Sequence, residues 1–114
     1  MSEKTLFGRI IDREIPSDII YEDEHCIAFR DISPQAPLHA LVVPRKPIPK
    51  VGDAGAADAA LLGQLLLAAG KVAEQQGYGE AYRLVINDGS GAGQTVFHLH
   101  VHVLGGRAFK WPPG

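Results

Sequence analysis

The sequence predicts one α+β domain, in which an antiparallel five-stranded sheet is combined with one long helix and a short N-terminal helix. Five short apolar segments bounded by polar turns are typical of strands, and residues 56–76 carry apolar side chains at helical spacing. The chain has 114 residues, of which 46% are hydrophobic. A chain of this size can form one core, so we expect a single domain over residues 1–114.

The first half of the chain is expected to form a short helix and a meander of three strands. Thr5 can cap a helix over residues 5–12, whose apolar side chains fall on one side. Strands are predicted at residues 19–22, 26–31 and 38–43, the last closed by Pro44. Alternation in the second strand places its residues on two faces, with Ile27, Phe29 and Asp31 on one and Cys26, Ala28 and Arg30 on the other.

The second half is expected to form the long helix and two further strands. The helix follows Pro47 and Pro49, extends over residues 56–76 and ends at Gly77. Its apolar residues cover almost its whole circumference, so it needs a second partner, for which another copy of the chain is a candidate. Strands are predicted at 82–87 and 95–104, joined by the loop 88–94 with glycine at every second position.

Composition limits the classes of function. The chain carries 11 basic and 13 acidic residues and no basic run beyond Arg45 and Lys46, which argues against a nucleic-acid partner. The single cysteine, Cys26, lies in an apolar stretch typical of a buried free thiol. We find no signal peptide and no segment approaching the roughly 18 apolar residues of a membrane span. We therefore expect a cytoplasmic protein without membrane contact.

Three histidines alternate with aliphatic residues in the segment VFHLHVHVLGG. On a strand, His98, His100 and His102 would form one row, with the aliphatic side chains on the opposite face. Such a row can combine a neutral nucleophilic ring with neighbours that donate hydrogen bonds to an anion. The preceding glycine-rich loop can present backbone N–H groups to a phosphate, and Thr95 adds a hydroxyl. These features favour a phosphoryl site.

Two other interpretations of the histidine row stay open. Two of the rings could share a metal ion, with His39 as another histidine in a predicted strand. Residues two apart on a strand are separated by about 6.7 Å, however, so three rings do not converge easily on one ion. The row could also consist of solvated strand residues, although three histidines in register argue against this.

The segment GQTVFHLHVHVLGG resembles the signature of the histidine triad superfamily, in which three histidines alternate with apolar residues. The similarity extends over nearly the whole chain, through LFGRII, EIPSDIIYED, DISPQAPLHALVVP and YRLVIND. The ending LGGR followed by WPPG is similar to the Hint branch of purine nucleotide-binding phosphoramidases. The resemblance implies a homodimer with a continuous sheet, the long helix at the dimer contact, and no metal or other cofactor.

The resemblance also implies roles for individual residues. His100 would attack the α-phosphorus of a purine nucleoside 5′-phosphoramidate, or of an acyl- or aminoacyl-adenylate, and form a nucleotidyl-histidine that water hydrolyses. His98 and His102 would stabilise the phosphoryl oxygens, His39 would support the triad, and Thr95 would assist the leaving group. Residues implied to bind the nucleotide are Phe7, Ile10, Phe29, Asp31, Ile32, Asn87, Gly93, Gln94, Thr95, His100, His102 and Trp111.

Several alternatives have to be distinguished by experiment. The protein could be a purine nucleotide-binding or scaffold protein with incidental hydrolysis, or a hydrolase of dinucleoside polyphosphates. Without the resemblance, Phe7 and Phe29 would be assigned to the core. Trp111 either reaches the partner subunit's site, as the resemblance implies, or caps the fold. Pro47 stands where many relatives have histidine.

Overall fold

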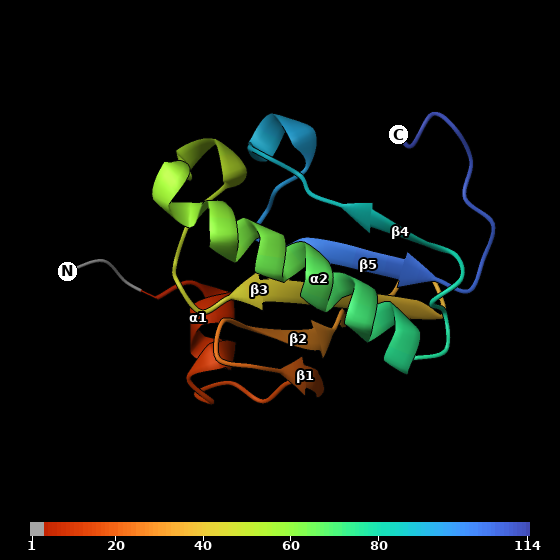
Figure 1. The fold of residues 1–114 in the computed structure, drawn as a ribbon, viewed down its shortest axis with the longest axis horizontal. Coiled ribbons are helices and arrows are strands. Elements are labelled where there is room, and N and C mark those ends of the chain that lie inside the picture. Colours follow the sequence, from red (N-terminus) through yellow and green to blue (C-terminus); the bar gives the residue numbers. More distant parts are fainter. Residues whose placement is uncertain (1–3) are drawn as a thin grey trace.

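A five-stranded antiparallel sheet in the order β1-β2-β3-β5-β4 forms the centre of the fold (Figure 1). The computed structural model describes residues 4–114. The strands are β1 (Ile19–Glu22), β2 (Cys26–Arg30), β3 (Leu38–Pro44), β4 (Tyr82–Val85) and β5 (Val101–Gly105). Every pairing is antiparallel, which confirms the predicted sheet.

Two α-helices lie where the sequence predicts them. The helix α1 (Leu6–Ile11) is capped by Thr5, whose hydroxyl accepts a hydrogen bond from the backbone N–H of Gly8. The helix α2 (Ala59–Gln75) is preceded by a 3₁₀ turn at Ala56–Asp58, so the first residues of the predicted helix form a tighter turn. Gly77 follows with a φ of 92°, a conformation that favours glycine after a helix. Further 3₁₀ turns lie at Val51–Asp53 and Ser90–Ala92.

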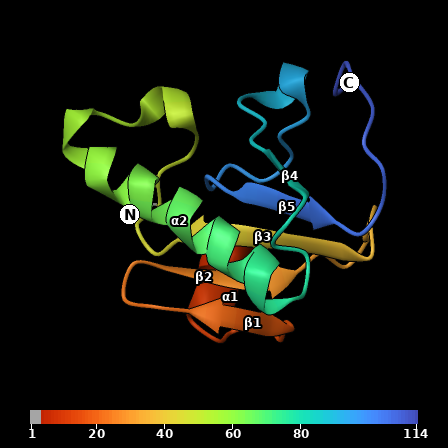
Figure 2. The same ribbon diagram turned by 45° about the vertical axis from the view of Figure 1, so that its right-hand side comes forward.

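The two helices cover opposite faces of the sheet (Figure 2). The face under α2 carries the larger apolar cluster, which includes Cys26, Ala28 and Leu65. The face under α1 carries a smaller cluster, to which Phe7, Ile10, Ile27, Phe29, Leu41 and Val43 belong. The predicted alternation in β2 is therefore confirmed. The histidine row lies on the α1 face, because the residues between the histidines pack under α2.

The last strand is shorter than the predicted 95–104. Only Val101–Gly105 pairs regularly, and residues 94–100 are irregular. The facing chain has Pro44 at the end of β3 and Pro47 and Pro49 beyond it, and prolines have no N–H to donate to a ladder. One backbone bond remains there, from the N–H of Leu99 to the carbonyl of Ile48. Side-chain alternation nevertheless continues, since Leu99 joins the cluster under α2 and His98 and His100 point the other way.

The helix α2 retains an unpartnered apolar surface. Its inner side is buried against the sheet through Leu65, Ala68, Ala69, Val72 and Ala73. Leu66 and Leu67 on the outer side are 50% and 62% exposed. Contrary to the expectation from sequence, residues Ala56–Gln75 are long and apolar enough to cross a membrane by length and composition alone. Core packing on the inner side buries 33% of its most apolar window.

Candidate functional site

Strand register brings residues from three strands together on the α1 face. Asp31 follows β2 and lies opposite His39 of β3, to whose carbonyl its N–H donates at 2.9 Å. Leu41 of β3 is paired with His102 of β5, which places His39 and His102 two rungs apart on adjacent strands. The sheet therefore collects a carboxylate and two imidazoles that are separated by up to 71 residues in the sequence.

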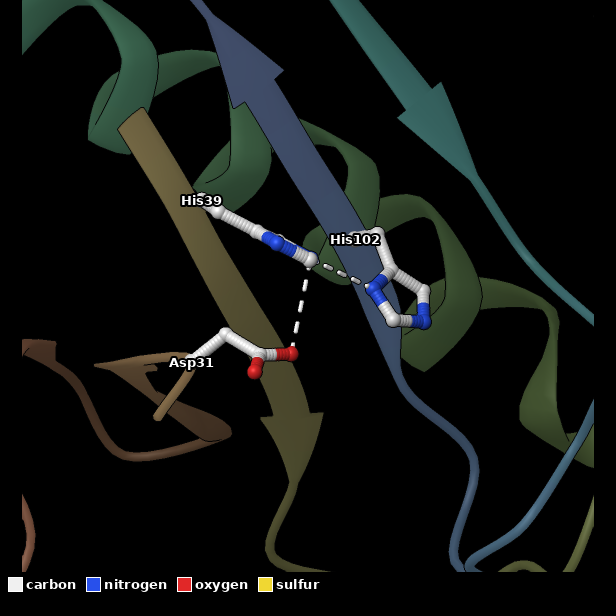
Figure 3. Close-up of side chains that lie close together, drawn as sticks. All are labelled: Asp31, His39 and His102. Carbon is white, nitrogen blue, oxygen red and sulfur yellow. Dashed lines mark hydrogen bonds and ion pairs between the residues drawn. The ribbon is translucent and has the colours of Figure 1, made fainter. Parts of the chain in front are cut away.

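Hydrogen bonds fix the proton positions on His39 and His102 (Figure 3). The backbone N–H of Gln35 donates to His39 Nδ1 at 3.0 Å, so a neutral His39 carries its proton on Nε2. That nitrogen lies 2.9 Å from His102 Nδ1 and 3.5 Å from a carboxylate oxygen of Asp31. His102 Nδ1 consequently accepts, and its own proton sits on Nε2. His102 is thereby held as a hydrogen-bond donor.

His100 is held in the opposite tautomer. Its Nδ1 lies 2.8 Å from the carbonyl oxygen of His98, which can only accept, so the proton is on Nδ1 and Nε2 carries the lone pair. The ring of Phe7 meets the His100 ring edge-on at 4.9 Å between centroids, and the His102 ring lies at 5.1 Å. Within residues 4–114, His100 Nε2 has no hydrogen-bond partner. An unprotonated imidazole nitrogen with no internal partner can act as a nucleophile.

His98 differs from the other two histidines because both of its ring nitrogens are engaged inside the protein. Nε2 donates to the carbonyl of Pro44 at 2.8 Å, and Nδ1 lies 3.0 Å from the hydroxyl of Thr5. The ring is only 1% exposed. The structure thus corrects the expectation that His98 contacts a phosphoryl oxygen through its ring: its contribution to the site is the backbone carbonyl that orients His100.

Burial favours the neutral form of the four site histidines. Desolvation is the largest cause that lowers the pKa of His39, His98 and His100 below the ordinary histidine value. Desolvation, with the neighbouring His100 and His39 rings, lowers the pKa of His102 to about 4. Asp31 opposes these shifts at three of the rings without reversing them. Neutral rings are the form that a histidine nucleophile and a neutral donor both require.

An apolar cavity of about 380 Å³ opens beside the histidines. It is bounded by α1, the segment after it, the end of β2, the middle of β3, and residues 95 and 96. Six residues implied by the resemblance line it: Phe7, Ile10, Phe29, Asp31, Ile32 and Thr95. Ile32 is 97% exposed and stands at the rim, whereas Phe7 and Phe29 are buried and also belong to the core. An apolar pocket with a carboxylate at its end fits a flat ring joined to a sugar.

Residues beyond those expected from the sequence also line this cavity: Leu6, Ile15, Pro16, Ser17, Arg30, Leu41 and Val96. Leu41 could have been predicted from the sequence. The strand that pairs with residues 26–31 places one residue opposite Phe29 on the same face, and that residue is Leu41. Ile15, Pro16 and Ser17 had no such signal, because their approach depends on how the chain turns back after α1. Their contribution is a matter of tertiary packing.

The glycine-rich loop has a backbone conformation that favours glycine at two positions. Gly89 and Gly93 have φ values of 90° and 97°. The buried amide of Gln94 accepts from the N–H of Gly89 and donates to the carbonyls of Pro49 and Val96. The amide of Gln94, which the resemblance implies to bind the nucleotide, therefore fastens the loop. Asn87 lies beside Gly93, and the exposed Thr95 follows on the cavity rim.

The C-terminal tail leaves Trp111 outside the cavity of its own chain. The ring of Phe109 lies under the guanidinium groups of Arg83 and Arg107, at 5.1 and 4.3 Å from the ring centroid. These contacts fix the start of the tail. Trp111 is 82% exposed, so it does not cap the fold. Its expected contact with a partner subunit's site stays a prediction.

Asp31, His39 and His102 form a group of candidate metal ligands, because their ligand atoms lie within 4.8 Å of one another. The hydrogen bonds do not suit a metal ion. A neutral His39 that coordinated through Nε2 would need its proton on Nδ1, where the N–H of Gln35 already points at 3.0 Å. The arrangement of this chain therefore fits a proton shared between histidines better than a metal centre.

The geometry defines a domain in which a row of histidines, at the start of the last strand and just before it, lies beside an apolar pocket. Comparison with known proteins shows its family. A model of the HIT domain matches residues 12–109. An uncharacterized HIT-like protein of Synechocystis sp. is 58% identical over 114 residues, with both chains covered completely. A 14 kDa zinc-binding protein of Zea mays is 51% identical over 115 residues, covering 96% of this chain and 88% of that protein. The chain belongs to the HIT family.

Solved structures agree with this assignment. A HIT family hydrolase from Legionella pneumophila superimposes with a TM-score of 0.94 at 47% identity, covering 97% of this chain and 100% of that one. A histidine triad nucleotide-binding protein from Candida albicans gives a TM-score of 0.81 at 27% identity, covering 96% and 83%. The predicted histidine triad fold is confirmed, and the structural relatives include hydrolases.

Proposed function

We propose that this protein hydrolyses purine nucleoside 5′-phosphoramidates through a nucleotidyl-histidine formed on His100. The observation that carries the proposal is the orientation of His100: its Nδ1 is bound to the carbonyl of His98 at 2.8 Å, which leaves the lone pair of Nε2 free. A neutral imidazole with its second nitrogen fixed is a competent nucleophile toward phosphorus. The lowered pKa of His100 favours that neutral form at physiological pH.

The reaction has two steps. In the first, Nε2 of His100 bonds to the α-phosphorus and the phosphorus–nitrogen bond of the substrate breaks. The departing amine needs a proton, and in this proposal the exposed hydroxyl of Thr95 relays it from solvent. His102 donates its Nε2–H to a phosphoryl oxygen, where negative charge increases in the transition state. In the second step, water attacks the phosphorus, the bond to His100 breaks, and the nucleoside monophosphate is released.

The cavity beside the histidines supports a nucleoside as the bound group. Phe7 links the two regions, because its ring lines the cavity and meets His100 at 4.9 Å. Phe29 packs against Phe7 at 5.3 Å between centroids, which adds a second aromatic wall for a base. Asp31 lies at the histidine end, where its carboxylate can accept hydrogen bonds from two vicinal ribose hydroxyls. The relative from Candida albicans is described as nucleotide-binding, which supports this assignment.

We also propose that the active form is a homodimer joined through α2. Leu66 and Leu67 leave an exposed apolar surface on that helix, and β4 is an edge strand beside it. An edge strand can pair with a second copy and continue the sheet. Light scattering at micromolar protein concentration should give about twice the 12.2 kDa mass of the chain. A monomer at that concentration would contradict the dimer but not the chemistry.

The proposed function is tested with an adenosine 5′-phosphoramidate in the presence of EDTA. The wild-type protein should release the nucleoside monophosphate, and mass spectrometry of rapidly quenched protein should find the nucleotidyl group on His100. H100A should lose both the adduct and turnover. H25A is the matched control, because His25 lies in the turn before β2, away from the site. Turnover by H100A, or an adduct on another residue, would overturn the assignment.

The same samples separate the alternative functions. A dinucleoside polyphosphate hydrolase would turn over that substrate faster than the phosphoramidate. For a binding or scaffold protein, calorimetry would detect binding of purine nucleotides with an affinity that EDTA does not change. Such a protein would turn over neither substrate. The two enzymes are therefore distinguished by the ratio of the two rates, and the binding protein by the absence of both.

A further inference from the structure

Thr5 and His98 are 93 positions apart in the chain, yet the Thr5 hydroxyl lies 3.0 Å from His98 Nδ1. The contact joins the residue that caps α1 to the first histidine of the row. The mechanism above uses neither side chain. His98 is 1% exposed, so its ring nitrogens have no access to water and depend on protein partners.

The direction of each hydrogen bond follows from groups that can act in only one way. The carbonyl of Pro44 can only accept, so His98 Nε2 bears the proton of that bond and Nδ1 must accept in the neutral ring. The Thr5 hydroxyl therefore donates its proton to His98 Nδ1. The same oxygen accepts the N–H of Gly8 at 3.0 Å. One hydroxyl thus closes a chain of hydrogen bonds from α1 through His98 to β3.

Holding His98 matters because its backbone orients the proposed nucleophile. The carbonyl of His98 receives the Nδ1–H of His100 at 2.8 Å. His98 lies in the irregular segment 94–100, where regular strand pairing does not hold the backbone. The two side-chain bonds of His98 replace that pairing. They fix the His98 ring at both nitrogens. Because the ring is part of the same residue, this also restrains the backbone carbonyl of His98.

We propose that Thr5 is a positioning residue: its hydroxyl donates to His98 Nδ1 and so fixes the His98 carbonyl that orients His100. This inference rests on the proposed function for its effect on turnover, but the hydrogen bond can be tested without it. The same helix also places Phe7 against His100, so α1 supports the histidine row through a polar and an apolar contact. The competing explanation is that Thr5 serves only as the helix cap.

Three substitutions separate donation to His98 from capping. T5S keeps a hydroxyl that can both accept from Gly8 and donate to His98. T5D keeps the cap, because a carboxylate accepts the N–H of Gly8, but the ionised group cannot donate to a neutral Nδ1. T5V removes both functions with little change in volume. If capping is the only role, T5D should resemble the wild type; if donation is the role, T5D should resemble T5V.

The kinetic result expected is a loss in kcat with little change in KM. T5S should retain most of the wild-type kcat, whereas T5D and T5V should fall by roughly ten- to a hundredfold, the scale of a misplaced catalytic group. Thermal unfolding of each variant identifies losses that come from misfolding. A wild-type kcat in T5V or T5D would overturn the proposal.

Imidazole ¹⁵N spectra provide the readout that does not depend on activity. In the wild type, His98 Nδ1 should resonate as an unprotonated nitrogen and Nε2 as a protonated one. T5D and T5V should both shift Nδ1 toward the position of an unbonded nitrogen, because neither side chain donates to it and burial lowers the pKa of His98, which disfavours a second proton on the ring. The Nδ1–H of His100 should exchange faster with water in T5V than in T5S. A protonated His98 Nδ1 in the wild type, or unchanged His98 and His100 signals in T5V, would refute the positioning role even if the protein had no phosphoramidase activity.

Discussion

Acidification should destabilise the folded protein, with His102 as a principal cause. Burial among His39 and His100 lowers the pKa of His102 to about 4 in the folded state, whereas an unfolded histidine has a pKa of about 6.5. Between these values the unfolded state binds the additional proton. Stability is therefore complete above the unfolded value and is lost progressively as pH falls from about 6.5 to about 4.

The size of the effect follows from those two values. At pH 5 an unfolded His102 is almost fully protonated, and the folded ring, with its pKa of about 4, is about nine-tenths neutral. Proton binding to the unfolded state then lowers the free energy of unfolding by about 2 kcal/mol relative to pH 7. His39, His98 and His100 also have lowered pKa values, so their contributions have the same sign.

The assay is urea unfolding followed by far-ultraviolet circular dichroism at pH 7 and pH 5, at one fixed protein concentration. H102Q should reduce the difference between the two pH values by about 2 kcal/mol, because glutamine does not titrate and its amide oxygen can still accept from His39. H25Q, at a histidine in the turn before β2 and outside this cluster, is the matched control. An H102Q protein with the full wild-type pH dependence would refute the reasoning.

Three further predictions concern packing. L65A should lower the free energy of unfolding by about 3 kcal/mol in urea titrations, since Leu65 is 1% exposed under the sheet. G106A should lower the free energy of unfolding by about 2 kcal/mol in the same assay, because Gly106 has a φ of 94° and an added Cβ would lie 2.8 Å from Tyr78. G91A is the control: a Cβ added there meets no atom within 4 Å, so its free energy of unfolding should be nearly that of the wild type. Cys26 should resist iodoacetamide in the folded protein and react once it is unfolded, because burial raises its pKa to about 12, and labelling of folded protein would show that the core opens.

Much of the fold could be predicted because its signals are local. Alternation in residues 26–31 correctly separated Ile27 and Phe29 from Cys26 and Ala28. Thr5 was identified as a cap from its position before an apolar helical pattern, which the structure confirms. The last strand was predicted too long, because its shortening depends on prolines in a distant facing segment. Alternating residue types alone do not show whether a partner strand has donors to offer.

The candidate site was predicted in composition more fully than in arrangement. Phe7, Ile10, Phe29 and Asp31 do line one cavity, although family resemblance rather than periodicity selected them. Gln94 was expected to bind the nucleotide, and in the structure its amide fastens its own loop. An amide that can donate and accept satisfies backbone groups as readily as a ligand. Only the coordinates show which of these it does.

The sequence by itself determined the fold class and which residue types meet on the histidine face, because strand and helix periods depend on neighbouring positions. Tertiary structure alone decided what each histidine can do. The proton of His39 is placed by the N–H of Gln35, that of His98 by the carbonyl of Pro44, and that of His100 by a backbone carbonyl. A histidine can donate from either nitrogen, so its role depends on which partners the fold brings to it.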